Sequence, residues 1–362
     1  MSISAAGICL IPGKILLMLY EKLCVLAGAV PFCTWIGGAP EIWQCVVYYV
    51  LLFGGIQIAL FLKEKGAYRV WRVLSRGICV AVVCVSIFIL GFRQKNLISI
   101  TCLDIGQGDG IVIQLPGGKT VMVDGGSSSK KKVASYQILP YLKNQGISVV
   151  DAMLISHTDL DHISGVQELL TLKEKHLTTL RIKNLLLPDW KAPEEVYYEL
   201  EEQAKRCGIS VLRLHQGQKL RFGDGSLEIL SPETGAKGTD VNEEGIVMEL
   251  RYGKFRGLFT GDIGAETEKK LLPKLDDVNF LKVGHHGSRY STCQEFLDKI
   301  KPELAVISCS ESNTYGHPSP ETTARLEENG IRTEYTMKNG AITVYTDGHS
   351  IRMKTFCNEK TA

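Results

Sequence analysis

Neither sign of charge dominates this sequence. Its 362 residues include 41 basic and 39 acidic side chains, which leave a formal net charge of +2. So small a surplus excludes an argument for nucleic-acid binding from bulk charge, and any such partner must be identified from local features. The length allows one sizeable domain and a smaller part, because single cores stop growing near roughly 250 to 300 residues.

Paired cysteine motifs are missing as well. Of the 11 cysteines, six lie in the apolar first part of the chain, where cysteine behaves as a small hydrophobic residue. The other five include no CxxC pair: Cys102, Cys207, Cys293, Cys309 and Cys357. This pattern argues against a disulfide framework and against a thiolate metal site.

The start of the chain lacks the basic residues of a signal peptide, so a cleaved leader fits poorly. Residues 1–40 are apolar, but Lys14, Glu21 and Lys22 interrupt them. Pro12 and Pro31 are expected to break them. We therefore expect an interfacial or bundle-packed helix in this segment.

Two long apolar runs follow. Ile42 to Leu62 contains 21 residues without a charge, enough to cross a hydrocarbon core of roughly 30 Å. Gly77 to Phe92 has 16 uncharged residues and spans only with help from Val73 and Leu74 or from a thinner bilayer. We place the two membrane spans at about 42–62 and 75–92. The alternative is a pair of buried core helices, which the length of the first run disfavours.

The segment between these runs is basic. It carries one Glu64 among five basic residues: Lys63, Lys65, Arg69, Arg72 and Arg76. Short loops rich in Lys and Arg stay in the cytoplasm, so we expect this loop inside and everything after about residue 93 outside. The sequence thus predicts a multi-pass plasma-membrane protein, with a membrane region at 1–96 and an extracytoplasmic domain at 97–362.

From Ile98 onward, short β-type runs alternate with helical patterns. Strands are expected at 98–103, 111–115, 120–126 and 152–156, with helices at about 133–144 and from about His162. Later strands are expected at 226–230, 245–252, 255–260, 279–283 and 303–308. This mixture predicts an α/β domain in which helices cover the sheets.

The segment Ser156–His162 contains four potential metal ligands in six residues: His157, Asp159, Asp161 and His162. Burying all of them without a cation would be costly, because unpaired carboxylates are strongly disfavoured in a low-dielectric site. We expect His157 and Asp159 to bind one metal, and Asp161 and His162 to bind its neighbour. The alternative is an exposed loop whose aspartate caps the next helix.

This HxDxDH pattern resembles the HxHxDH metal motif of the metallo-β-lactamase superfamily, with Asp159 in place of the second histidine. Further segments resemble, in order, motifs of the C-terminal domain of ComEC-type DNA-uptake proteins: LDIGQGD (103–109), VDGG (123–126), LFTGD (258–262), KVGHHGS (282–288) and NTYGHP (313–318). The resemblance covers about residues 98–355 and implies an αββα sandwich. PFCTWIGGAP (31–40) before the first long run resembles the end of the same family's membrane channel domain.

Asp262 ends the expected strand FRGLFTGD. Its carboxylate would suit a bridge between two cations held about 3.5 to 4 Å apart. The alternative is an N-cap of a helix that starts at Gly264.

His285 and His286 follow the strand NFLKV, and adjacent residues leaving a strand point in different directions. We therefore expect only one of them to be a ligand. The resemblance favours His286, on the metal that carries Asp161 and His162, with His285 nearer the substrate phosphate or its leaving group.

Several other polar residues are expected to support the site. Asp124 should hold His157 or His162 through an imidazole N–H. Asp104, Gln107 and Asp109 lie in a Gly-rich turn and are interpreted as supporting residues rather than ligands.

His317 could donate to the phosphate or its leaving oxygen, and with His285 and Asp161 it completes the expected catalytic set. The alternative is a hydrogen-bonded loop histidine beside Pro318. Ser319 stands where the family often has a second histidine, which weakens a role for this loop.

The expected substrate contacts are basic or hydroxyl side chains: Lys130, Lys131, Lys132, Lys282 and Ser288. The three consecutive lysines could hold a nucleic-acid backbone in a salt-dependent way, or could simply be solvated. Three carboxylates and three imidazoles form a harder ligand set than three histidines, which favours two Mn²⁺ ions over Zn²⁺. Such a pair of metals requires no side-chain nucleophile.

The resemblance implies a metal-dependent nuclease that cuts DNA outside the membrane during DNA uptake. Nothing resembles a base-reading helix, so DNA contacts should be confined to the backbone. The alternatives are a phosphodiesterase of cell-surface polymers and a non-catalytic DNA-binding subunit of a channel. β-Lactam hydrolysis is not expected with Asp159 in place of histidine. The chain begins inside the family's channel domain, so the remaining channel helices, or DNA-uptake proteins on another chain, are candidate partners.

Overall fold

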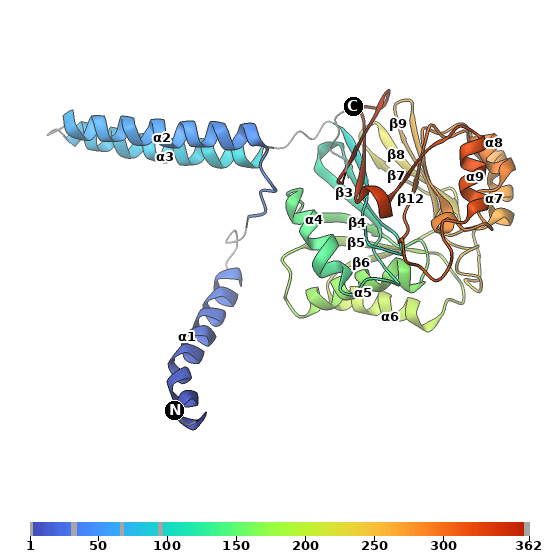
Figure 1. Cartoon of the computed structure of the whole chain (residues 1–362), viewed down its shortest axis with the longest axis horizontal. Helices are drawn as coiled ribbons and strands as arrows, with labels where there is room; N and C mark the ends of the chain where they lie inside the picture. The colour runs from blue at the N-terminus through green and yellow to red at the C-terminus, as the bar shows by residue number, and fades with distance from the viewer. Residues whose placement is uncertain (1–2, 30–34, 66–68, 93–96, 358–362) are drawn as a thin grey trace.

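Two β-sheets lie face to face in the computed structural model, which describes residues 3–29, 35–65, 69–92 and 97–357 (Figure 1). The strand order of the first sheet is β15 (Ile351–Thr355), β14 (Ile342–Thr346), β1 (Ile98–Cys102), β2 (Gly110–Leu115), β3 (Lys119–Asp124), β4 (Val149–Leu154), β5 (Arg181–Pro188), β6 (Ser210–Leu214). The order of the second sheet is β13 (Arg332–Tyr335), β12 (Leu304–Ile307), β11 (Phe280–Lys282), β10 (Phe255–Phe259), β9 (Val247–Tyr252), β8 (Gly225–Ser231), β7 (Lys219–Phe222).

Side-chain alternation along the strands builds a core on each face of each sheet. On β2, Ile111 and Ile113 pack between the two sheets, whereas Val112 packs against helices. The helices on the first sheet are α4 (Leu139–Asn144), α5 (Leu160–Glu174) and α6 (Glu195–Arg206). Those on the second are α7 (Ala265–Leu271), α8 (Gln294–Ile300) and α9 (Pro320–Glu328). The expected αββα sandwich is confirmed.

Shorter helices complete the domain. A π-helix at Ala134–Ile138 precedes α4, within the stretch expected to be one helix. The remaining short turns and helices are η1 (Pro116–Gly118), η3 (Leu272–Lys274), η4 (Gly284–Gly287) and α10 (Thr336–Asn339).

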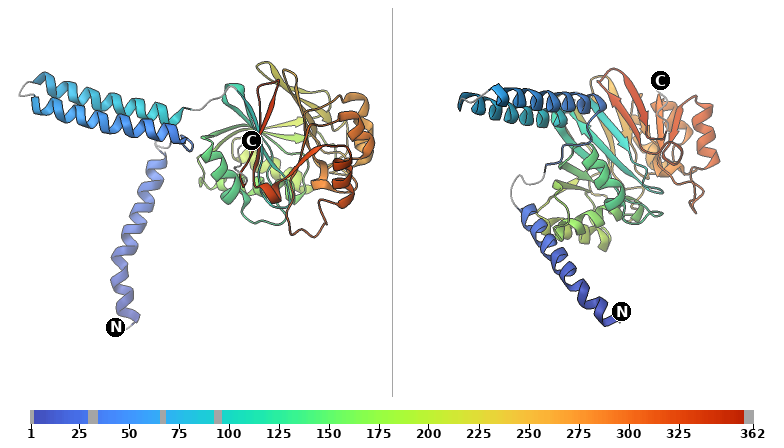
Figure 2. Two further views of the ribbon diagram at one scale, coloured as in Figure 1. Left: turned by 45° about the horizontal axis from the view of Figure 1, so that its top comes forward. Right: turned by 60° about the vertical axis from the view of Figure 1, so that its left-hand side comes forward.

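Three apolar helices precede the sandwich: α1 (Ile3–Ala29), α2 (Ile42–Lys65) and α3 (Arg69–Gly91). Within α2 and α3, Ile42–Leu62 and Val73–Gly91 are long and apolar enough to cross a membrane, and only 11% and 6% of their hydrophobic windows are buried. They pack on each other as an antiparallel hairpin (Figures 1 and 2). So little burial does not fit a pair of core helices.

The expected break at Pro12 is wrong, because Pro12 lies inside α1, which continues through it. Apolar helices tolerate an internal proline when neighbouring groups satisfy the freed backbone. Pro31 lies outside the described residues, and so does the tip of the basic loop at 66–68. The side chains of Lys63, Lys65, Arg69 and Arg72 are also outside them.

Candidate metal centre

The candidate ligands come from loops at the carboxyl ends of parallel strands. β4 is parallel to β3, and β10, β11 and β12 are parallel to one another. The carboxyl ends of such strands meet at one edge of each sheet, where α/β proteins place their ligands. The loop after β4 carries the HxDxDH residues, and the loops after β10 and β11 carry Asp262 and the two adjacent histidines.

His157 and His162 are fully buried, with ring centroids 3.9 Å apart. Asp159 occupies the N-cap position of α5, but its carboxylate makes no capping hydrogen bond. Its side chain is 48% exposed, and Oδ2 lies 3.6 Å from His157 Nε2. Burial of both histidines excludes the exposed-loop interpretation, although Asp159 itself reaches solvent.

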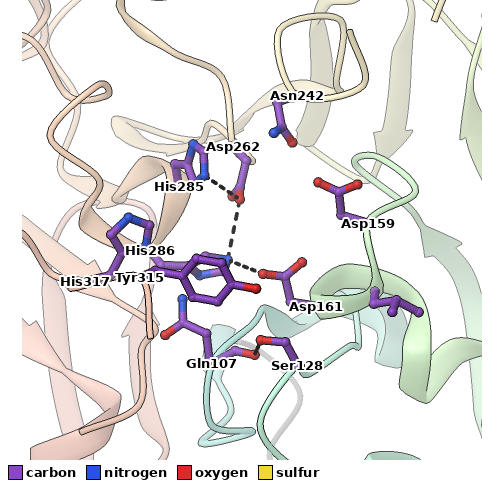
Figure 3. A pocket seen from close by; sticks show the side chains of 11 residues that line it. Gln107, Ser128, Asp159, Asp161, Asn242, Asp262, His285, His286, Tyr315 and His317 are labelled. Atoms are coloured by element: carbon purple, nitrogen blue, oxygen red, sulfur yellow. Dashed lines mark hydrogen bonds and ion pairs between the residues drawn. The ribbon is translucent and has the colours of Figure 1, made fainter. Parts of the chain in front are cut away.

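Asp262 contacts several members of the cluster, and Figure 3 shows it joined to His285 and His286. Its Oδ1 is 3.4 Å from His162 Nε2, and its Oδ2 is 3.4 Å from His286 Nε2. Helix α7 starts at Ala265 with Gly264 as its N-cap, so Asp262 does not cap it. The carboxylate therefore faces both sides of the cluster, as a bridging ligand would.

The two adjacent histidines diverge. His286 is buried, and its Nε2 lies 3.4 Å from Asp161 Oδ2, while its Nδ1 is 3.0 Å from the Ser308 carbonyl. His285 is partly exposed, and its Nε2 lies 3.9 Å from Asp262 Oδ2. Both have positive φ, 48° and 52°. This conformation is uncommon for residues other than glycine and is tolerated where the surroundings enforce it.

Asp124 orients one of the buried imidazoles. Its Oδ2 lies 2.9 Å from His162 Nδ1, and both carboxylate oxygens accept hydrogen bonds from Ser156, at 2.7 Å each. An N–H at Nδ1 leaves Nε2 of His162 free to act as an acceptor on the side of Asp262.

Two glycines allow the loops of the first sheet to approach each other. A Cβ at Gly126 would overlap the backbone of Leu160 and His162, and a Cβ at Gly108 would overlap that of Gly126 and Asp161. The same turns are joined by backbone hydrogen bonds, including Asp109 N to Asp161 O at 3.0 Å. Any side chain at these positions would push the ligand turn outward.

The charges in the cluster reinforce one another. Burial alone would raise the pKa of the Asp161 carboxyl, but the nearby imidazoles of His286 and His162 lower it to about 2. Burial also opposes ionisation of Asp262, yet His286 and His162 hold its pKa well below its usual range. Burial favours a neutral His162, but Asp262 and Asp124 raise its pKa well above the ordinary value. Both carboxylates are thus ionised, as metal ligands must be.

The residues fit divalent cations. The buried ligand atoms without any hydrogen-bond partner are Nε2 of His157, Nε2 of His162, Nε2 of His286 and Oδ1 of Asp262. Unsatisfied buried polar atoms are costly and rare, so their convergence indicates a missing ligand. Sets that could hold one ion include His157, His162 and Asp262, and also Asp161, His162 and His286. Imidazole and carboxylate donors suit Zn²⁺ and Mn²⁺.

Two expected substrate contacts are wrong. Lys282 is 1% exposed, and its ammonium lies 2.8 Å from Asp109 Oδ2 inside the protein. Ser288 is also buried, and its Oγ accepts a hydrogen bond from Tyr290 N at 3.4 Å. Neither side chain lines the pocket, because each is occupied within the fold.

The lysine loop lies beside the site rather than in it. Lys130 pairs with Asp104, with Nζ 3.0 Å from Oδ1, so both side chains are engaged with each other. Lys131 and Lys132 are exposed. They follow Ser128, which does line the pocket. Of the three lysines in this loop, Lys131 and Lys132 are therefore the two that remain available to contact a polyanion.

The cavity at the centre has a volume of about 450 Å³. It is lined by Gln107, Ser128, Asp159, Leu160, Asp161, Asn242, Asp262, His285, His286, Tyr315 and His317. Within the described part of the chain, none of its lining residues is a lysine or an arginine. Ser128, Leu160, Asn242 and Tyr315 were not expected from the sequence. Of these, Tyr315 lies inside the NTYGHP motif and Leu160 inside the HxDxDH segment, whereas Ser128 and Asn242 belong to no motif.

His317 lies in the pocket with its ring against two other rings. The centroid distance is 5.8 Å to Tyr315, in a stacked arrangement, and 5.6 Å to His285, edge to face. Burial, followed by the charges of His285 and His286, lowers the pKa of His317 to about 4. Near neutral pH this imidazole is therefore uncharged and can offer one N–H and one acceptor nitrogen.

Two sheets packed between helices, ligand loops that converge at one edge and buried imidazoles without partners are together typical of one class of metalloprotein. A family model described as the metallo-β-lactamase superfamily matches residues 103–311, and the chain belongs to that superfamily. The fold implies divalent metal ions and supports a metal-dependent hydrolase.

Within that class, the curated homologues are proteins of the ComEC type, which confirms the resemblance. The chain is 29% identical to ComE operon protein 3 of Bacillus subtilis (strain 168), over 75% of this chain and 36% of that protein. It is 30% identical to Recombination protein 2 of Haemophilus influenzae, over 75% and 32%, respectively. It is 27% identical to Competence protein ComA of Neisseria gonorrhoeae, over 68% and 32%. The chain thus spans about a third of the length of these relatives.

Proposed function

We propose that this chain is a two-metal phosphodiesterase that hydrolyses DNA outside the membrane during DNA uptake. The observation that carries the proposal is the cluster of buried imidazole and carboxylate atoms without partners, in which Asp262 and His286 line the pocket and His162 lies directly behind Asp262. One relative is named a competence protein, which supports a role in DNA uptake.

The ligands would divide into two groups that share Asp262. His157 and Asp159 would hold one ion, and Asp161, His162 and His286 would hold the other. A pair of divalent ions supplies Lewis-acid chemistry, because it lowers the pKa of water and stabilises charge that develops on phosphoryl oxygens.

The protein's own groups would orient this chemistry. Asp124 fixes the ring of His162 through Nδ1, so the free Nε2 keeps its direction. His285 is partly exposed beside Asp262 and could contact a phosphoryl oxygen or the leaving oxygen. His317 would act as a neutral N–H donor to the same oxygens, since its pKa is lowered to about 4 by burial and the nearby histidines.

The identity of the metal should follow from Asp159. Its carboxylate makes the site harder than one with histidine at this position, which favours Mn²⁺ over Zn²⁺. The test is Asp159→His, which should shift the metal content toward zinc when the protein is loaded from an equimolar mixture. An unchanged Mn²⁺ to Zn²⁺ ratio, measured by mass spectrometry of the metals, would contradict this assignment.

The apolar helices support the proposed location. Residues 1–96 would form the membrane region, with spans near Ile42–Leu62 and Val73–Gly91 and their basic connection in the cytoplasm. The domain from residue 97 would then be extracytoplasmic. A reporter fused after residue 96 should be active only outside the cytoplasm, and activity only inside would overturn this orientation.

One observation favours a second candidate, a phosphodiesterase of cell-surface polymers. No lysine or arginine among the described residues lines the pocket, so the lining offers no such side chain that would select the two closely spaced rows of phosphates of duplex DNA over a single polyol-phosphate chain. Such an enzyme would use the same metals on a polymer without bases.

The deciding experiment uses the full chain in detergent, loaded with Mn²⁺ or Zn²⁺. We expect cleavage of DNA of many sequences, abolished by a chelator and by Asp262→Asn. Failure of the metal-loaded protein to cut single- or double-stranded DNA, together with hydrolysis of a polyol-phosphate polymer, would replace the nuclease with the second candidate.

A further inference from the structure

We propose that Tyr315 is a stacking platform for an unpaired nucleobase next to the scissile phosphate, so that the enzyme prefers single-stranded nucleic acid. This inference rests on the proposed nuclease function and adds the strand preference and the residue that sets it. It comes from the geometry of the loop that follows β12 and from the chemistry of the pocket wall.

The ring of Tyr315 is placed for such a contact. It lines the pocket and is 60% exposed. One face lies against His317, with an interplanar angle of 22°. Figure 3 shows the ring extending from the side of His317 toward Asp161. A base entering the pocket could therefore extend an existing stack of two rings, within reach of the metal ligands.

The loop holds this ring in a defined position. Oδ1 of Asn313 accepts hydrogen bonds from Tyr315 N, at 3.2 Å, and from His317 N, at 2.9 Å. Its Nδ2 donates to the carbonyls of Ser310 and His317, at 2.7 and 2.5 Å. Gly316 takes the positive φ of 71° that the turn requires. One amide thus fixes the loop on both sides of Tyr315, so little ordering is required on binding.

The rest of the pocket leaves stacking as the main contact beyond the metals. Its charged lining residues other than histidine are all acidic: Asp159, Asp161 and Asp262. Lys282 is buried in its pair with Asp109, and Lys130 is paired with Asp104. Single-strand binding proteins combine a basic groove with aromatic platforms. Since the lining residues supply no lysine or arginine, the aromatic surface carries the preference for single strands. A base in a duplex is already stacked and paired, so only an unpaired base can use it.

The test compares two single-stranded substrates with the same number of phosphates. One is an oligothymidylate, and the other is an abasic oligomer of the same length. The full chain, loaded with Mn²⁺ in detergent, is assayed as wild type, Tyr315→Ala and Tyr315→Phe. Tyr198→Ala is the control, because Tyr198 lies on α6, is 45% exposed and does not line the pocket.

We expect Tyr315→Ala to raise KM for the oligothymidylate by roughly 5- to 150-fold, the effect of losing one base–aromatic contact. KM for the abasic oligomer should not change, and Tyr315→Phe and Tyr198→Ala should resemble the wild type. An unchanged KM for the oligothymidylate, or an equal loss on both oligomers, would overturn the stacking role while leaving the nuclease intact.

The two proposals can fail separately. If the wild type cuts neither oligomer with any metal, the nuclease proposal fails. The stacking role is then judged by fluorescence anisotropy of labelled oligomers bound to the metal-loaded protein. A loss of affinity for the oligothymidylate alone in Tyr315→Ala would support it, and equal affinities of the variant and the wild type would refute it.

Discussion

Lys282→Met distinguishes a buried structural ion pair from a DNA contact. Lys282 and Asp109 are each 1% exposed, and their charged atoms are 2.8 Å apart. Burial opposes both charges, yet each partner's charge raises the pKa of Lys282 and lowers that of Asp109. Removing the ammonium would leave a buried carboxylate without its partner, which costs about 3–5 kcal/mol.

This loss should be visible as a lower melting temperature. At about 2–4 °C per kcal/mol for a domain of this size, the expected decrease is about 6–20 °C. Trp190 is buried in the core beneath α6, so tryptophan fluorescence of the full chain in detergent can report unfolding of the sandwich. The double variant Lys282→Met, Asp109→Asn should recover part of the loss, because no unpaired charge remains.

The opposite outcome is equally clear. If Lys282→Met melts like the wild type but binds DNA more weakly, with a shallower salt dependence, then the ammonium of Lys282 contacts phosphate. The ion pair with Asp109 would then not be its main interaction. That result would restore the expectation drawn from the sequence.

Three further predictions concern the metal centre. Asp262→Asn should lose at least one metal equivalent and nearly all activity while its far-UV circular dichroism stays unchanged, and full metal content would show that Asp262 is not a ligand. Gly126→Ala should destabilise the domain by about 1–3 kcal/mol, because its Cβ would overlap the backbone of Leu160 and His162; thermal unfolding within error of the wild type would contradict this. Metal affinity should weaken as pH falls, starting above about pH 6.5, because Asp262 raises the pKa of both His162 and His286 and a metal must displace their protons. Titration calorimetry in buffers of different ionisation enthalpy should then record proton release on metal binding. A metal affinity that does not depend on pH would count against both ligands.

The fold could be predicted where strands are buried on both faces. Residues 98–102, 110–115 and 255–259 are buried along almost their whole length, and each strand was expected within two residues of its observed ends. Six strands were not expected. Two of them, β5 and β14, lie inside the first sheet, and the other four lie at the sheet edges: β6, β7, β13 and β15. Edge strands carry charged side chains and are half exposed, so their period-2 pattern is weak. Only pairing with a neighbour identifies them.

The residues of the candidate site that lie in short sequence motifs could be predicted. The roles of residues that depend on burial in the folded protein could not. The ligand turn and Asp262 follow strands, so their convergence could be inferred from strand order. The fate of Lys282 could not, since its burial depends on Asp109, which lies far away in the sequence. Asn242 lies in a loop without any motif, so no local pattern places it in the pocket.

Strained backbone and unsatisfied buried polar atoms occur together at the edge of the sandwich that carries the ligand loops, and that combination argues for a binding site independently of any homology. Asp124, His285 and His286 all have positive φ, which costs of order 1–3 kcal/mol for each residue. Three buried imidazole nitrogens have no hydrogen-bond partner at the same edge. A sequence selected for stability alone would lack such features, because apolar replacements of buried polar groups are often neutral or stabilising. Their retention together is explained if they serve a common ligand, and cations between the imidazoles and carboxylates are the ligand that offsets both costs.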